Sequence, residues 1–122
     1  MKKFLCAVLV VLVLAGLSYA IEDAGTVSFQ DFVAQTRNSV KLERLYLGKY
    51  VTVTGCAVSN IHAKGNEYVL EAWNGYTVDF TFTAANAEQI ADLDKGDVVT
   101  IRGIVQRNQY GFVTLYNCEI IE

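Results

Sequence analysis

The stretch Val51-Thr52-Val53-Thr54-Gly55 decides the fold. Apolar and polar residues alternate along it, and a glycine follows. The same pattern returns as Val99-Thr100-Ile101-Arg102-Gly103. Alternation with a period of two is typical of a β-strand that buries one face, and a glycine within a strand often marks a bulge or a sharp bend. The two stretches therefore predict two bent strands of one curved sheet.

The residues around these stretches predict three more strands and a helix. We expect strands over residues 50–61, 67–72, 76–83, 97–106 and 112–121. Asn74-Gly75 is a strong hairpin signal between the second and third of them. The segment 84–93 is rich in Ala, Glu and Gln, which predicts a helix. Five strands with a helix between the third and the fourth are the layout of the OB-fold, a small and partly open β-barrel.

An extra N-terminal helix is expected over about residues 29–47, before the barrel at about 50–121. Ser28 followed by Asp31 resembles a capping box. Asn38-Ser39 is expected to interrupt or kink the helix, and Gly48 to end it. Because the five predicted strands outweigh this helix and the one over 84–93, the predicted fold class is mainly β. The helix would present two apolar stripes, namely Phe29, Phe32 and Val33, then Val40, Leu42, Leu45 and Tyr46.

Residues 1–20 have the features of a secretory signal peptide. A short basic region precedes an almost wholly apolar run over residues 4–17, and Ser18 and Ala20 are the small residues before a cleavage site. A retained membrane anchor is the alternative, although 17 uncharged residues are short for a span of ~20. Cys6 lies inside the apolar run, so we expect no lipid attachment. Cleavage would leave residues 21–122 as a single exported domain without a membrane span.

The charge of this predicted mature domain argues against a polyanionic ligand. The signal contains two of the ten basic residues and no acidic ones, which leaves eight basic and thirteen acidic residues, a net charge of −5. Contacts with phosphates supply most of the affinity of non-specific nucleic-acid binding. An acidic domain is poorly suited to make them.

The register of the hairpin around Asn74-Gly75 determines which residues face outward. A two-residue loop would bring Glu67 and Glu71 into the core. We therefore expect a three-residue loop, 73–75, which pairs Ala72 with Tyr76, because a slip of one residue inverts the face of a whole strand. The core face of the hairpin then holds Tyr68, Leu70, Ala72, Tyr76, Val78, Phe80 and Phe82.

The opposite face of the same two strands is the candidate binding site. OB-folds usually bind ligands there, framed by the loops after the first and fourth strands. The face has three acids and no base, so it is either a solvated surface or a docking face for a cationic partner. Trp73 is the candidate anchor, or it packs under a neighbouring loop. The candidate residues are Glu67, Val69, Glu71, Trp73, Thr77 and Asp79, with Tyr110 in a framing loop.

Catalytic and metal-binding motifs are missing from the sequence. It contains no nucleophile elbow and no phosphate loop. His62 is the single histidine, and the aspartates at 92, 94 and 97 lack the glycine and glutamate of a calcium loop. Glu71 and Asp79 could act as a carboxylate pair, but so small a domain has little material for a shielded cleft. We expect no enzyme activity, no metal and no cofactor.

Cys56 and Cys118 are the two cysteines of the predicted mature domain. An even pair in an exported protein permits one disulfide. Two buried thiols are the alternative, and the sequence leaves both open.

Several motifs resemble the bacterial tRNA-anticodon-like OB-fold family, whose members are small exported or lipid-anchored proteins. The likeness runs from about residue 33 to 121 and implies the fold and export. It supplies no catalytic residues, and the family name does not imply tRNA binding. We therefore expect a non-catalytic interaction module of the cell envelope that binds an envelope protein or a small ligand. A carrier or sensor for a small cation or an oligosaccharide is the alternative, and single-stranded nucleic-acid binding ranks below both. The motifs are Asn38, Val40, Tyr46, Gly48-Lys49, residues 51–55, Leu93-x-Lys95-Gly96-Asp97-x-Val99-Thr100-Ile101-x-Gly103 and Leu115-x-Asn117-Cys118.

Overall fold

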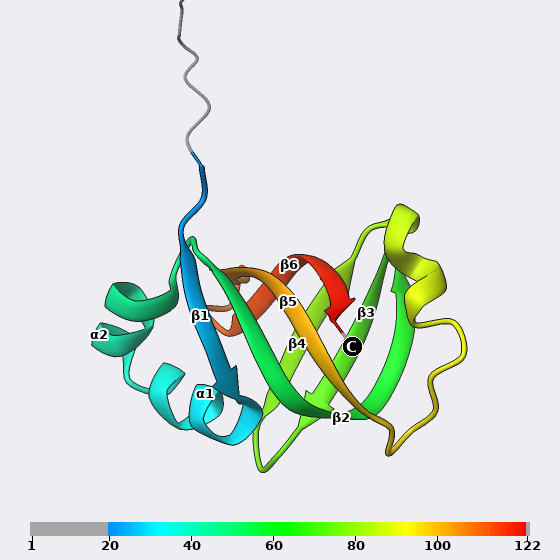
Figure 1. Ribbon diagram of the computed structural model, residues 1–122, viewed down its shortest axis with the longest axis horizontal. Coiled ribbons are helices and arrows are strands. Elements are labelled where there is room, and N and C mark those ends of the chain that lie inside the picture. The colour runs from blue at the N-terminus through cyan, green and yellow to red at the C-terminus, as the bar shows by residue number, and fades with distance from the viewer. Residues whose placement is uncertain (1–19, 122) are drawn as a thin grey trace, which may run out of the picture.

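The computed structural model describes residues 20–121 and is mainly β, as predicted (Figure 1). The predicted signal peptide, its alternative as an anchor and Cys6 lie outside this range, apart from Ala20. The helical segments are α1 (Phe29–Thr36), α2 (Ser39–Lys41), the π-helical turn η1 (Leu42–Tyr46) and the 3-10 helix η2 (Ala84–Gln89). The strands are β1 (Asp23–Ser28), β2 (Tyr50–Lys64), β3 (Glu67–Trp73), β4 (Thr77–Phe82), β5 (Val98–Arg107) and β6 (Val113–Ile121).

Five of the six strands close into a ring. The sheet has the order β1-β2-β3-β4-β6-β5, and β5 also pairs with β2. The contact that closes the ring between β4 and β6 is parallel and short, since it consists of the pairs Asp79–Thr114 and Phe80–Leu115. This arrangement is OB-like. β1 lies outside the ring along the first half of β2 and was not predicted, because none of its residues is buried and its two half-buried residues, Ala24 and Val27, do not alternate.

Two glycines mark the predicted bends. Gly55 has a φ of 72°, which favours glycine, and the register between β2 and β5 shifts around it, between Val53 and Cys56. β2 pairs with β1 up to Thr54 and with β5 up to Ala57, and from Val58 onward it pairs with β3. Gly103 lies at the corresponding shift between β5 and β6. The two sequence stretches that predicted a curved sheet are therefore the places where it curves.

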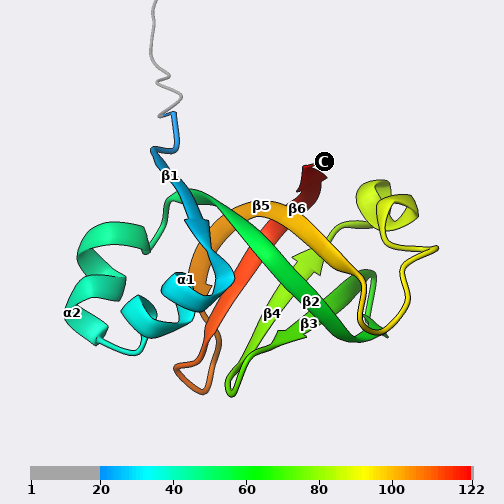
Figure 2. The ribbon, with the colours of Figure 1, turned by 60° about the horizontal axis from the view of Figure 1, so that its bottom comes forward.

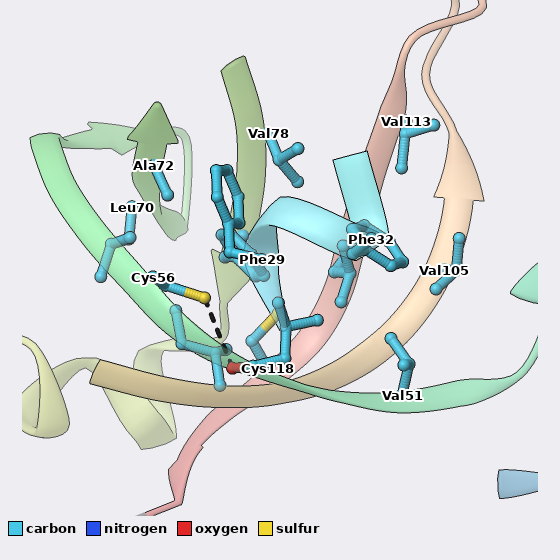
Figure 3. Packing of buried hydrophobic residues seen from close by; sticks show 14 of the residues in the cluster. Phe29, Phe32, Val51, Cys56, Leu70, Ala72, Val78, Val105, Val113 and Cys118 are labelled. Atoms are coloured by element: carbon cyan, nitrogen blue, oxygen red, sulfur yellow. Dashed lines mark hydrogen bonds between the residues drawn. The ribbon is translucent and has the colours of Figure 1, made fainter. Parts of the chain in front are cut away.

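Side chains from α1 fill one end of the ring. Phe29 and Phe32 are 4% and 0% exposed and point among Val78, Val105 and Val113 (Figure 3). Full burial of one such ring contributes about 1.5–3 kcal/mol. η2 lies at the opposite end of the ring, at the right of Figure 1.

The N-terminal helix is broken where the sequence predicts. Ser28 caps α1, because its Oγ accepts a hydrogen bond from the Asp31 amide at 3.1 Å. Asn38 then caps α2, with its Oδ1 accepting from the Val40 and Lys41 amides at 3.0 and 3.2 Å. These side chains satisfy amides that have no partner within a helix. One continuous helix over 29–47 is therefore replaced by three short segments.

The hairpin of β3 and β4 has the predicted faces but a different register. Its three-residue loop is 74–76, and Ala72 pairs with Val78 instead of Tyr76. A shift of two residues preserves the face of every side chain. The expected core residues Leu70, Ala72, Val78, Phe80 and Phe82 are therefore fully buried. The prediction for Tyr68 was wrong, because it lies at the end of β3 and is 38% exposed.

The predicted helix over 84–93 is shorter and is a 3-10 helix. Its polar side chains hydrogen-bond to the edge of β6 beyond the short contact with β4. Asn86 Nδ2 donates to the Cys118 carbonyl at 3.0 Å, and the Ile120 amide donates to Gln89 Oε1 at 2.7 Å. These bonds pair backbone groups that would otherwise form an open sheet edge.

Both cysteines are buried free thiols in the structure. Cys56 Sγ donates to the Val53 carbonyl at 3.4 Å, the dashed line in Figure 3. Burial raises the pKa of Cys56 to about 12, and burial also raises the pKa of Cys118. A thiol that stays protonated and is shielded from solvent is a poor nucleophile. Gly103 makes room for Cys118, since a Cβ at Gly103 would lie 2.6 Å from Cys118 Sγ.

Gly103→Ala is expected to destabilise the protein by about 1–3 kcal/mol, the usual cost of overpacking a core. The cost should be smaller when the change is made in a Cys118→Ala protein, because the shortest contact is then removed. Urea unfolding of the four proteins of this cycle measures both values. An equal cost in the two backgrounds would show that Cys118 is not the obstacle.

Candidate functional site

The outer face of β3 and β4 carries the residues predicted for the site, but its centre is closed. Glu67 and Thr77 are exposed, and the side chain of Glu71 is 30% exposed. Val69 is only 2% exposed, and Thr81, which lies opposite it on β4, is 5% exposed. The expectation that Val69 contacts a partner is therefore corrected. Val69 lies on the middle strand of three, between His62 and Thr81, and is shielded by its neighbours.

Two carboxylates face each other on this surface. Glu71 and Asp79 are directly opposite across β3 and β4. His62 Nδ1 lies 3.4 Å from Glu71 Oε2. Burial raises the pKa of Asp79, the charge of Glu71 raises it further, and His62 and Lys64 oppose the shift. Among residues 20–121, no group donates a hydrogen bond to the carboxylate of Asp79 or forms an ion pair with it.

The loop between β5 and β6 holds two aromatic side chains in solvent. Asn108 Oδ1 accepts hydrogen bonds from the amides of Tyr110 and Phe112 at 2.8 and 3.0 Å, and the Asn108 amide donates to the Phe112 carbonyl at 2.8 Å. Tyr110 is 74% exposed and Phe112 57%. An ordered loop that exposes large apolar side chains is typical of a binding surface.

Phe112 was missed by the sequence prediction, which placed it in the last strand. The apolar pair Phe112-Val113 resembles the start of a strand. Asn108 and Gly111 are the available signals, because Asn favours side-chain turns and Gly111 has a φ of 83°. These signals extend the loop to Phe112.

Two hollows border the face and meet at Asn108. Figure 2 shows the β3–β4 and β5–β6 loops side by side at the bottom of the view. The first hollow has a volume of about 210 Å³ and is lined by Tyr76, Thr77, Asp79, Asn108, Phe112 and Val113. The second has about 340 Å³ and is lined by Lys64, Asn108, Gln109, Tyr110 and Tyr116.

Trp73 borders a different hollow from the one that contains Asp79. It lies opposite Thr77 in the ladder, and its side chain faces a space of about 380 Å³ beside Phe29 and Gly55. Trp73 is 59% exposed, which rules out the alternative that it packs fully under a loop.

A larger hollow lies elsewhere, at the end of the ring near η2. It has a volume of about 670 Å³ and is bordered by Ile61, Tyr68 and the segment 87–93. Volume alone does not identify a binding site. We place the candidate site at the face of β3 and β4, because polar groups and exposed aromatic rings converge there.

The described part of the chain contains neither a metal-binding cluster nor a membrane-spanning helix. Between residues 20 and 121, no group of three or more His, Cys, Asp or Glu side chains could hold a metal ion. No helix within the same range has the length and apolar character needed to cross a membrane.

Comparison with family models places the chain in a known family. The model of the tRNA_anti-like family matches residues 1–120. The chain belongs to the tRNA_anti-like family. This confirms the resemblance predicted from the sequence, and it assigns no ligand to the site. Among curated proteins, no sequence matches this chain.

Two solved structures are similar to this tRNA_anti-like protein. A "putative nucleic acid-binding lipoprotein" from Klebsiella pneumoniae subsp. pneumoniae MGH 78578 is 27% identical, with a TM-score of 0.66, over 80% of this chain and 91% of that one. The Stn1–Ten1 complex of S. pombe is 16% identical, with a TM-score of 0.50, over 60% of this chain and 58% of that one. The second likeness shows the fold alone.

Asp79→Asn is expected to raise the thermal midpoint at about pH 7. The native state raises the pKa of Asp79, so it favours the protonated acid, and ionisation lowers stability. By linkage this loss is complete above the raised pKa and disappears as the pH falls below the ordinary value of 3.8. The advantage of the variant should therefore shrink as the pH is lowered. Differential scanning fluorimetry across this range measures it.

The matched control is Asp92→Asn, at an exposed position beyond η2, which should show no such pH-dependent gain. If the stability gain of Asp79→Asn did not depend on pH, or if the variant were less stable than the wild type, the raised pKa of Asp79 would be contradicted.

Proposed function

We propose that this protein is a non-catalytic binding module of the cell envelope, which takes a positively charged partner on the outer face of its OB-type barrel. One observation carries the proposal. The half-buried carboxylate of Asp79, without a partner among the described residues, lies in the same hollow as the exposed Phe112 of an ordered loop. Burying a charge without a partner costs stability, and residues with such a cost are enriched at functional sites.

The charges of the surface favour a cationic partner. Glu67, Glu71 and Asp79 lie on β3 and β4, and no Lys or Arg lies on these two strands. Lys64 adjoins the face from the end of β2. A partner with positive groups would reduce the repulsion between Glu71 and Asp79. Electrostatic complementarity of this kind contributes to the specificity and the rate of association.

The same geometry supports the absence of catalysis. The hollow that contains Asp79 is lined by neither Glu71 nor His62, so no second acid or base shares it with Asp79 for acid and base roles. The two thiols are shielded in the core. His62 is exposed, and its contact is with Glu71 rather than with a nucleophile.

A location in the cell envelope is supported by two observations. The first 20 residues resemble a secretory signal. The similar Klebsiella protein is described as a lipoprotein.

Single-stranded nucleic acid is the second candidate ligand. The description of the Klebsiella protein favours it, and so does the hollow lined by Lys64, Tyr110 and Tyr116. Binders of single strands combine a positive groove with aromatic rings on which bases stack. The carboxylates on β3 and β4 oppose phosphate binding, so we rank this candidate second.

Binding of two labelled probes separates the candidates. A peptide of alternating lysine and serine is expected to bind the purified protein, and a thymidine oligonucleotide of equal length is expected to bind more weakly at the same salt concentration. Joint replacement of Tyr110 and Phe112 by serine should weaken peptide binding ~30-fold, since two exposed aromatic anchors that contribute about 1 kcal/mol each lower the binding free energy by about 2 kcal/mol. Fluorescence anisotropy measures the affinities.

The matched control is Val98→Ser, which removes an apolar side chain that is 66% exposed and borders a separate hollow. Its affinity for the peptide should equal that of the wild type. Tighter binding of the oligonucleotide than of the peptide would reverse the ranking of the two candidates.

A further inference from the structure

We propose that the hollow between the β3–β4 and β5–β6 loops binds the ammonium group of a lysine side chain on an extended peptide. This inference rests on the proposed function and specifies its partner. The hollow combines two aromatic rings, Tyr76 and Phe112, with the carboxylate of Asp79 and the polar side chains of Thr77 and Asn108.

The chemistry of the lining matches an organic ammonium ion. Aromatic faces attract cations, and the attraction grows when the site excludes water. A carboxylate in the same hollow supplies a charge-assisted hydrogen bond. The volume of about 210 Å³ admits a four-carbon chain with its ammonium group. The rings would contact the methylene groups while Asp79 receives the charge.

One wall of the hollow already attracts a cation from the protein itself. The Cζ atom of Arg37 lies 5.7 Å from the centre of the Tyr76 ring. Asp79 itself has no ion pair among the described residues, because no basic nitrogen of residues 20–121 lies within 4.0 Å of its carboxylate. The negative charge of Asp79, which lowers the stability of the free protein, is therefore available to a positively charged ligand.

The opposite wall is held in place before any ligand arrives. Asn108 fixes the loop through its bonds to the amides of Tyr110 and Phe112. A preformed loop does not have to be ordered on binding, which lowers the entropic cost of association. The exposed Phe112 ring is thus positioned to contact a ligand rather than to complete the core.

The arrangement of the two hollows favours an extended ligand over a small free amine. They meet at Asn108, and the second contains Tyr110 and Tyr116 together with Lys64. A small amine would occupy the first hollow only. A peptide can place a lysine against Asp79 and a neighbouring side chain against Tyr110. Lysine fits better than arginine, because its compact ammonium group needs less space than a planar guanidinium in a hollow of about 210 Å³.

Peptide titrations of the full protein test the lysine site. The probes are the labelled lysine–serine peptide, the same peptide with Nε-acetylated lysines, and its arginine counterpart. Acetylation of the lysines and, separately, Asp79→Asn should each lower the affinity ~10-fold, the value of a hydrogen bond between charged groups. The arginine peptide should bind more weakly than the lysine peptide. Phe112→Trp should preserve the affinity for the lysine peptide, and Phe112→Leu should lower it, because tryptophan keeps the cation–π contact.

The control variant is Glu67→Gln, which removes an exposed carboxylate from the same face but outside the hollow. Its effect should be smaller than that of Asp79→Asn. Equal effects of the two variants, or equal binding of acetylated and unmodified peptides, would overturn the lysine site and leave the proposed function standing. Displacement of the peptide by n-butylammonium at the affinity of the whole peptide would overturn the peptide as the occupant. Failure of both basic peptides to bind would instead refute the proposed function itself.

Discussion

The bend of β2 at Gly55 is the constraint on which the rest of the structure depends. A single strand of 15 residues pairs with β1, β3 and β5, which is possible only because its direction changes at a residue with a positive φ. An alanine there would have space for its Cβ but would adopt a conformation that L-residues rarely take. The ring then closes through two residue pairs between β4 and β6. Because this closing contact is so short, the ring also depends on its buried core and on the hydrogen bonds from Asn86 and Gln89 to the backbone of β6.

Closure of the ring also creates the candidate site. It brings β6 next to β4, so that the loop before β6 lies beside the loop before β4. Residues separated by some thirty positions, Asp79 and Phe112, thus share a hollow. The strands fix this hollow, while its carboxylate is poorly compensated within the protein. A loss of stability from an uncompensated carboxylate is expected where a protein trades stability for binding.

The sequence contained enough information for the five strands of the ring, the bends and the faces of the central hairpin, but not for β1. Alternation identifies the strands, and avoidance of buried carboxylates selects the correct face for Leu70 and Phe80. The exact pairing was two residues away, because periodicity fixes faces and does not fix register. Phe112 was misplaced, because its exposure depends on side-chain bonds from Asn108. The burial of Val69 depends on its neighbours across three strands, and no local pattern reports that.

The most direct test of the account is to map the amide chemical shifts of the isotopically labelled protein during titration with the lysine–serine peptide. The account predicts that the shifts concentrate at residues 76–79 and 108–113, around the hollow that contains Asp79. Shifts confined to Ile61, Tyr68 and residues 87–93 would place the site in the hollow of about 670 Å³ beside η2 and would contradict this prediction.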